Sequence, residues 1–438
     1  MNLFIRSSLF VCCIFFSACL VMENTFTKLP PGIWRATLQL QPPDAPSAEK
    51  KEDVSIKSFE ETASTELPFL MEVKYTDDDN FYIEIINGKE RIRADEIKFG
   101  RDRSRAMDTI RIDFPLFDSY IRGRFQERVI RGEWVVNYKE NYSIPFVAEY
   151  GRDFRFTNLK KPPTADLSGK WQATFGLDEE KPYAAVGEFT QNDNQLSGTF
   201  LTETGDYRYL DGTVQGDKFY LSCFDGSHAF LFEGKILAAD SIVGTFKSGT
   251  HYKTTWEAMR NEKAKLADPD SLTFLKDGFE KIEFSFENTE GQMISLDAPQ
   301  YSGKVKILQI MGTWCPNCLD ETNFLLEYLK HDQGSQVAVI GLAFEKYKEK
   351  EKAMTALRTY KNRLGIDYEL LLAGYANKKE AAEKLPMLNA ISSYPTMIFV
   401  DKNDKVRRIH TGFSGPATSE FADFKNDFIN FVGQLIAE

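Results

Sequence analysis

The 438-residue chain has few residues that bind transition metals and no excess of positive charge. It contains six cysteines and four histidines, and only Cys315 and Cys318 have the C-x-x-C spacing of half a zinc site. The sequence has no second pair to complete four ligands, so neither a metal nor another cofactor is predicted, and zinc is kept as an alternative. The net charge of −11 argues against nucleic acid or an anionic lipid surface as a main partner.

Long hydrophobic runs are also missing, except for a short one at the N-terminus. Residues 1–19 place Arg6 before an apolar stretch and end in small residues, which is the pattern of a secretory signal. The apolar stretch is shorter than the ~20 residues that a membrane-spanning helix needs. The small residues before Cys19 resemble a bacterial lipobox, which implies that Cys19 is lipidated and anchors the chain to a membrane. Ordinary cleavage after Ala18 is the alternative, and either route predicts export to the periplasmic or cell-envelope side.

Helical periodicity is scarce between residues 28 and 260. Alternating or aromatic-rich runs recur there between Gly, Asn and Asp residues, which predicts antiparallel β structure of barrel or sandwich type. A weak internal repeat divides the region, because GIWRAT at 32–37 is echoed by GKWQAT at 169–174. We therefore expect two related β units, at residues 28–158 and 165–260.

Several features of this region need no catalytic role. Trp34 and Trp171 open the two repeats and are expected to fill the cores, with ligand stacking as the alternative. Cys223 is expected to be a buried core thiol, with pairing to another chain as the alternative. The polar stretch 41–66 occurs only in the first unit and is expected to be a mobile excursion. The charged stretch 261–276 is expected to be a linker to the last domain.

The main candidate for chemistry is the sequence WCPNC, which runs from Trp314 to Cys318. Residues 304–310 before it predict a buried strand, and residues 319–330 after it predict a helix. The free N–H groups at a helix start favour a thiolate. We therefore expect Cys315 to be the accessible attacking thiol and Cys318 the buried resolving thiol. A zinc half-site and a structural disulfide are the alternatives.

From about Phe279 onward the chain resembles the TlpA/ResA branch of the thioredoxin-like thiol-disulfide oxidoreductases. The elements of that family occur in order, with a leading hairpin at 284–296, an active-site turn at 312–315 and a cis-proline loop at 394–396. The resemblance implies a redox-active disulfide between Cys315 and Cys318. It further implies active-site positions around that pair, namely a cis Pro395 and the neighbours Trp314, Pro316, Asn317, Tyr394 and Thr396.

Glu321 lies three residues after Cys318, where this family carries an acidic residue. The resemblance implies that Glu321 helps to move protons during exchange. The alternative is an ordinary first-turn carboxylate favoured by the helix dipole.

The expected architecture is multidomain, with two antiparallel β barrel-like or sandwich-like units followed by an α/β thioredoxin-like domain at residues 277–438. The expected function is that of an exported, lipid-anchored thiol-disulfide oxidoreductase. By resemblance it reduces disulfides of client proteins and receives electrons from an upstream donor. The alternative from another class is a ligand-binding or protein-binding lipoprotein whose β units carry the main function and whose redox domain is accessory. A peroxidase is disfavoured, because Leu308 and Gly312 stand where peroxiredoxins need Pro and Thr or Ser.

Overall fold

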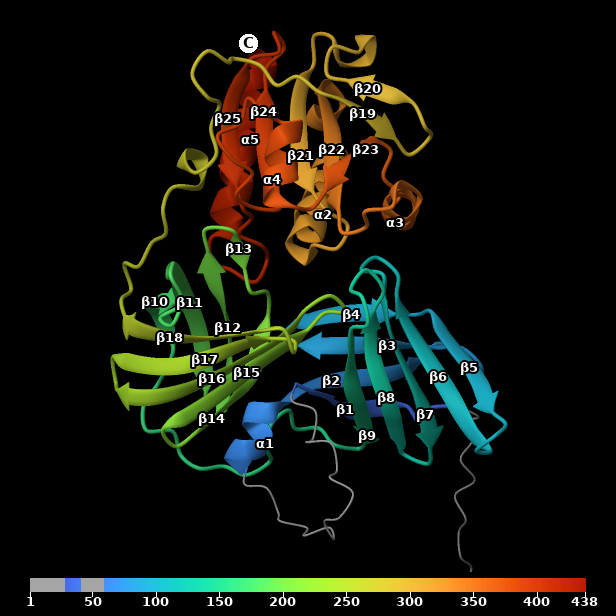
Figure 1. Cartoon of the computed structure of the whole chain (residues 1–438). Helices are drawn as coiled ribbons and strands as arrows, with labels where there is room; N and C mark the ends of the chain where they lie inside the picture. Colours follow the sequence, from blue (N-terminus) through green and yellow to red (C-terminus); the bar gives the residue numbers. More distant parts are fainter. Residues whose placement is uncertain (1–27, 41–58) are drawn as a thin grey trace, which may run out of the picture.

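The computed structural model describes residues 28–40 and 59–438. The predicted signal at 1–19, Cys19 and residues 41–58 of the predicted excursion lie outside the described residues. Three sheets make up the described chain, and Figure 1 shows the two β units side by side below the α/β domain. The predicted multidomain architecture is therefore confirmed.

The first β unit is an open, half-barrel sheet of nine antiparallel strands. Its order is β4-β3-β2-β1-β9-β8-β7-β6-β5. The strands are β1 (Gly32–Gln39), β2 (Glu66–Tyr75), β3 (Phe81–Asn87), β4 (Glu90–Ala94), β5 (Ile97–Asp102), β6 (Met107–Phe114), β7 (Ser119–Gln126), β8 (Val129–Val136) and β9 (Ser143–Tyr150). The helix α1 (Phe59–Thr65) precedes β2 and buries Ala63, so the end of the predicted excursion is ordered by packing on the sheet.

The second β unit closes into a barrel, because β11 pairs with both β10 and β12. The strands are β10 (Gly169–Phe175), β11 (Tyr183–Asn192), β12 (Gln195–Thr202), β13 (Gly205–Asp206), β14 (Leu210–Gln215), β15 (Lys218–Phe224), β16 (Ala229–Ala238), β17 (Ser241–Ser248) and β18 (Tyr252–Arg260). Phe175, Phe200 and Trp256 pack ring against ring in its interior. The barrel therefore has a packed aromatic core.

The two units correspond in register as well as in sequence. The first strand pairs with the last in each, and Ala36 lies opposite Ala148 as Ala173 lies opposite Ala258. Both repeat tryptophans are fully buried, and each indole N–H donates to the carbonyl four residues earlier, at 3.1 Å for Trp34 and 2.9 Å for Trp171. The prediction that they fill the cores is confirmed. Cys223 is likewise a buried, free thiol of the barrel core.

The α/β domain has a seven-stranded mixed sheet of order β20-β19-β23-β22-β21-β24-β25, in which β21, β22 and β23 are parallel. Its strands are β19 (Ser285–Asn288), β20 (Met293–Ser295), β21 (Val305–Met311), β22 (Val337–Glu345), β23 (Glu369–Tyr375), β24 (Thr396–Val400) and β25 (Val406–Thr411). Its helices are α2 (Pro316–Leu329), α3 (Lys350–Leu364), α4 (Lys378–Lys384) and α5 (Phe421–Ala437). Three short 3₁₀ turns lie at Pro269–Ser271, Pro299–Tyr301 and Asp332–Gln336.

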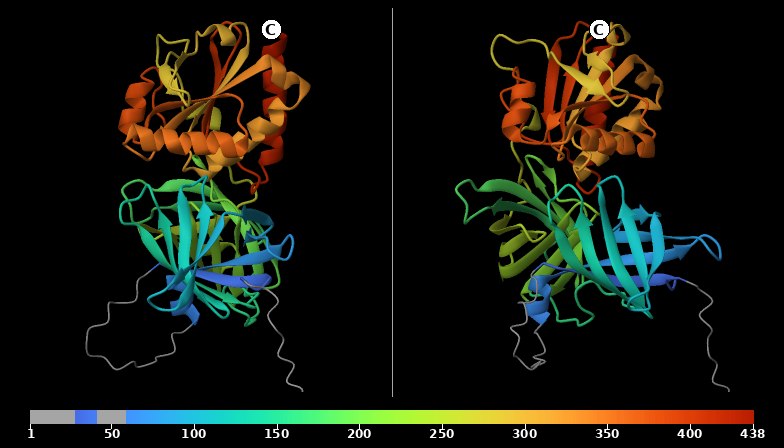
Figure 2. Two further views of the ribbon diagram at one scale, coloured as in Figure 1. Left: turned by 90° about the vertical axis from the view of Figure 1, so that its right-hand side faces the viewer. Right: turned by 45° about the vertical axis from the view of Figure 1, so that its right-hand side comes forward.

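Helices cover both faces of this sheet, which Figure 2 shows from two further sides. Side chains of α2 and α5 pack with Ile307 of β21, whereas Ala381 of α4 packs with Leu308 on the opposite face. Strand β21 is consequently buried along its whole length, as the apolar run before WCPNC predicts. Within the two described ranges, no helix is both long and apolar enough to cross a membrane.

The predicted linker at 261–276 is attached to its neighbours at both ends. Ala264 packs against Val186 and Leu201 of the barrel. Thr273 is buried, and Leu275 forms a β-bridge with Leu388 of the α/β domain. The connection is therefore anchored to the barrel at its start and to the α/β domain at its end.

Candidate active site

The two cysteines lie at the turn from β21 into α2. Cys315 is the N-cap of α2, and its Sγ accepts a hydrogen bond from the backbone N–H of Cys318 at 3.2 Å. Pro316 occupies the first turn, where its missing N–H leaves no bond unmade. Both cysteines are free thiols. Cys318 is fully buried, as expected, but Cys315 is only 6 % exposed and is less accessible than the sequence predicts, because the barrel covers it.

The loop before β24 lies against Cys315. The Tyr394–Pro395 peptide bond is cis, as the resemblance implies. The Cys315 thiol donates to the carbonyl oxygen of Tyr394 at 3.4 Å. The Thr396 hydroxyl donates to the carbonyl of Ser393 at 2.9 Å and closes the loop. The proline loop therefore forms one wall of the site.

Trp314 forms a second wall. Its ring centroid lies 5.6 Å from that of Tyr394, and its indole N–H donates to the carbonyl of Phe344 at 2.9 Å. The ring is thereby fixed across the ends of β21 and β22. The residues that the family resemblance implies as neighbours of the cysteine pair thus lie together around Cys315.

Glu321 belongs to α2, and its side chain is fully buried. It is therefore not an ordinary first-turn carboxylate, which was the alternative. In the described residues neither of its carboxyl oxygens has a hydrogen-bond partner of good geometry. Burial raises the pKa of Glu321 to about 8, against an opposing contribution from the neighbouring Gln309 amide. Gln309 itself donates to the carbonyl of Cys318 at 3.2 Å. A carboxyl that titrates near neutral pH therefore lies within the surroundings of the buried cysteine.

Burial also raises the pKa of the Cys318 thiol, and Cys315 and Glu321 raise it further. Cys318 therefore needs a proton acceptor before it can act as a nucleophile. The structure places this thiol in an apolar environment together with the carboxyl of Glu321.

Two residues at the end of β22 were not predicted from the sequence. Glu345 is buried and accepts hydrogen bonds from the backbone N–H and the hydroxyl of Thr313, at 2.9 and 2.8 Å. Burial raises the pKa of Glu345 to about 7. The Nζ of Lys346 lies 4.2 Å from the centroid of the Trp314 ring. Their position at the end of the strand beside β21 could have identified them from the sequence, because ligands of open α/β sheets bind at the carboxyl ends of the strands.

The barrel covers the site with two segments, residues 203–208 and 225–228. The Asn317 side chain donates to the carbonyl of Asp206 at 3.1 Å, and the Ser393 hydroxyl donates to the carbonyl of Thr204 at 2.8 Å. The Ser227 hydroxyl donates to the carbonyl of Trp314 at 2.9 Å. Backbone and side chains on both sides of Cys315 are therefore held by the second β unit.

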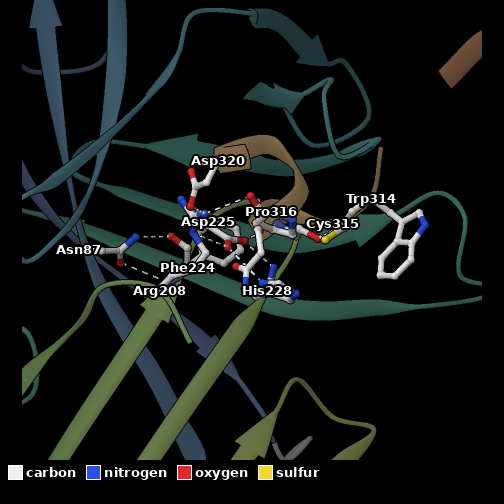
Figure 3. A network of polar contacts seen from close by, with 12 residues as sticks. Asn87, Arg208, Phe224, Asp225, His228, Trp314, Cys315, Pro316 and Asp320 are labelled. Carbon is white, nitrogen blue, oxygen red and sulfur yellow. Dashed lines mark hydrogen bonds and ion pairs between the residues drawn. The ribbon is translucent and has the colours of Figure 1, made fainter. Parts of the chain in front are cut away.

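Arg208 joins all three parts of the molecule, and Figure 3 shows it beside Asp225 of the barrel and Pro316 and Asp320 of the α/β domain. It donates to the Pro316 carbonyl at 3.2 Å and pairs with the carboxylate of Asp320 in the α/β domain. It also pairs with Glu90 of the first β unit at 2.5 Å and with Asp225 of the barrel at 3.5 Å. Burial opposes the charge of Arg208, but the three carboxylates outweigh it and raise the pKa of the guanidinium.

Comparison with known proteins places the similarity in the C-terminal part. The Redoxin family model matches residues 277–427. The chain is 23% identical over 140 residues to the thiol-disulfide oxidoreductase ResA of Bacillus subtilis, which is 32% of this chain and 69% of that protein. The resemblance inferred from the motifs is therefore confirmed.

Solved structures of this kind are also similar. One is a thiol:disulfide interchange protein of the thioredoxin family from Chlorobium tepidum, with 20% identity, coverage of 37% of this chain and 99% of that chain, and a TM-score of 0.28. Another is a secreted thiol-disulfide isomerase from Corynebacterium glutamicum, with 18% identity, coverage of 40% and 99%, and a TM-score of 0.30.

Proposed function

We propose, from the premise that residues 277–427 form a redoxin domain, that this chain is an exported thiol-disulfide oxidoreductase that uses Cys315 and Cys318. One observation carries the proposal. The Sγ of Cys315 lies at the start of α2, 3.2 Å from the N–H of Cys318 and 3.4 Å from the Tyr394 carbonyl of the proline loop. A thiolate in that position is stabilised by the helix N-terminus.

The proposed reaction reduces disulfides of client molecules in two exchanges. The Cys315 thiolate attacks one sulfur of the client disulfide, forms a mixed disulfide and releases the first client thiol. The Cys318 thiolate then attacks the Sγ of Cys315, releases the second client thiol and closes the Cys315–Cys318 disulfide. The client gains two electrons and two protons, and an upstream dithiol donor returns the pair to the reduced state.

Glu321 is proposed to take the proton of Cys318 before the second exchange. Burial raises the pKa of Glu321 to about 8, so its carboxylate is a stronger base than a solvated one, and it lies in the same apolar environment as the thiol. The carboxyl can return the proton when the pair is reduced again.

Export and anchoring through Cys19 are proposed from the sequence pattern of residues 1–19. The substitution Cys19→Ala is expected to move the protein from the membrane fraction to the soluble fraction of cells that express it. A wild-type protein that is already in the soluble fraction, with an unmodified N-terminus, would rule the anchor out.

An insulin reduction assay on the full chain tests the activity. With dithiothreitol as donor, the wild type is expected to accelerate the reduction and Cys315→Ser to abolish the acceleration. Cys223→Ala serves as the matched control, because Cys223 is a free thiol buried in the barrel core. Equal rates for the wild type and Cys315→Ser would refute the proposal.

A further inference from the structure

A cleft lies where the two β units and the redoxin domain meet. It has a volume of about 550 Å³, and its lining includes Lys139 of the first unit, His251 of the second and Lys346 of the redoxin domain. A second cavity of about 390 Å³ is lined by Cys315 itself. The two hollows adjoin, because both are lined by His228 and Trp314. Volumes of this size are typical of sites for small molecules rather than for folded proteins.

The larger cleft gathers positive charge in a chain whose net charge is −11. In the part of the chain that the structure describes, Lys139 and Lys346 have no carboxylate within ion-pair distance. Each ammonium instead lies over an aromatic ring, Lys139 at 4.4 Å from the Tyr142 centroid and Lys346 at 4.2 Å from that of Trp314. Glu345, the acid next to Lys346, is engaged by Thr313.

The positive charge of Lys346 also repels that of Lys139. Burial lowers the pKa of Lys139 to about 8, and repulsion from Lys346 contributes. Burial lowers the pKa of Lys346 as well, against opposing contributions from Cys315 and Glu345. The pKa of His251 is lowered by burial and then by Lys139. Half-buried cations without a counterion are destabilised, and a bound anion would offset both the repulsion and the lost hydration.

The smaller cavity differs in charge. Its acidic lining residues are Glu203 and Asp206, and the carboxylate of Asp206 accepts from the N–H of Gly415 at 2.7 Å. Carboxylates of a ligand are therefore favoured in the larger cleft and disfavoured beside Cys315. Aromatic side chains, among them Tyr207 and Phe230, line both hollows and suit an apolar or aromatic body between the two.

We propose that this cleft is a substrate site for a small, carboxylate-bearing disulfide, whose anionic end lies between Lys139 and Lys346 and whose sulfurs reach Cys315. The inference rests on the proposed function and specifies its substrate class. The exchange is the one given above: one disulfide becomes two thiols while the protein dithiol becomes a disulfide. In a single turnover the reduced protein supplies both electrons, so no further donor is needed.

Three small disulfides of different charge test the site. The pre-reduced full chain is mixed with dithiobis(nitrobenzoate), a dianion, with neutral bis(hydroxyethyl) disulfide, or with cystamine, a dication. The double variant Lys139→Met, Lys346→Met is expected to react about tenfold more slowly than the wild type with the dianion and no more slowly with cystamine. Lys348→Met, an exposed lysine outside the cleft, is the matched control. Equal slowing with all three disulfides would overturn the charge-based site.

A binding measurement separates this inference from the redox proposal. In Cys315→Ser, which lacks the proposed attacking thiol, nitrobenzoate is expected to quench tryptophan fluorescence, and the two lysine substitutions are expected to abolish that quenching. Quenching without any exchange activity in the wild type would support the site and refute the redox proposal. Exchange activity without charge-dependent binding would refute the site and leave the redox proposal standing.

Discussion

Glu321 is a residue whose environment differs from what its sequence position suggests. An acidic residue near the start of a helix is usually solvated and stabilised by the dipole. Here the side chain is fully buried between α2 and the sheet, because α2 begins at Pro316 and turns this position toward the core. The sequence placed Glu321 near the cysteine pair through the family resemblance, but burial depends on packing that local pattern does not contain.

The pH dependence of stability tests this environment. The pKa of Glu321 rises from 4.5 to about 8 on folding, so between these values the folded state holds a proton that the unfolded state has lost. Stability is therefore lost as pH rises through this window, by up to about 1.4 kcal/mol per pH unit. Glu321→Gln removes this loss, and its free energy of unfolding relative to wild type is expected to improve steadily from pH 5 to pH 8.

Urea unfolding at several pH values measures the effect. Glu327→Gln is the matched control, because Glu327 lies on the same helix but is exposed. A Glu321→Gln difference that does not change with pH would show that Glu321 is ionised in the folded protein.

At the scale of elements, the sequence predicted the strand and the helix on either side of the cysteine pair and the β character of residues 28–260. Residues 304–310 were predicted as a buried strand and residues 319–330 as a helix, and they correspond to β21 and α2. The strands β4 and β5 were not predicted, because they are the two edges of the first sheet and carry charged side chains instead of an alternating apolar pattern. The helix α1 was missed for a related reason, since its sequence FEETAST is mostly polar.

The position of the two cysteines at the start of α2 predicts how fast each of them reacts. Cys315 precedes the helix and lines a cavity, whereas Cys318 lies inside the helix and is fully buried. Iodoacetamide is therefore expected to label Cys315 of the reduced protein at least about tenfold faster than Cys318 near neutral pH. Mass spectrometry of peptides after short labelling times decides the order, and faster labelling of Cys318 would reverse the two roles.

At the scale of the whole molecule, the docking of the barrel on the cysteine pair was not predictable from the sequence. The contacts join positions about 100 residues apart, such as Arg208 with Pro316 at 3.2 Å. Arg208 stands in an irregular stretch between β13 and β14, where a charged residue ordinarily faces solvent. The same docking explains why Cys315 is covered. It also explains why the cleft beside Cys315 is lined by residues of both β units and of the redoxin domain.

Arg208→Met tests how firmly this docking is held. The substitution leaves Asp320, Glu90 and Asp225 without their shared cation, and breaking a buried ion pair in this way costs about 3–5 kcal/mol. We expect the redoxin domain to separate more readily from the barrel, so that Cys315 is alkylated faster and the amides of residues 314–317 exchange hydrogen faster. Hydrogen exchange and timed alkylation measure both changes.

Arg363→Met is the matched control for this prediction. Arg363 pairs with Glu96 across the domains, but the two side chains are 36% and 37% exposed, so the loss is expected to be below about 1 kcal/mol. Asp320→Asn opens the network from the redoxin side and guards against misfolding of the barrel. Unchanged alkylation of Cys315 in both Arg208→Met and Asp320→Asn would contradict a docked, covering barrel.

The central claim is that Cys315 attacks disulfides and Cys318 resolves them. A trapping experiment tests it most directly: the reduced full chain carrying Cys318→Ser is mixed with insulin, and the mixed disulfides are separated without reductant and mapped by mass spectrometry. We expect Cys318→Ser to accumulate an adduct through Cys315, whereas Cys315→Ser accumulates none. An adduct through Cys318 in Cys315→Ser at the same yield, or no adduct through Cys315 in Cys318→Ser, would contradict it.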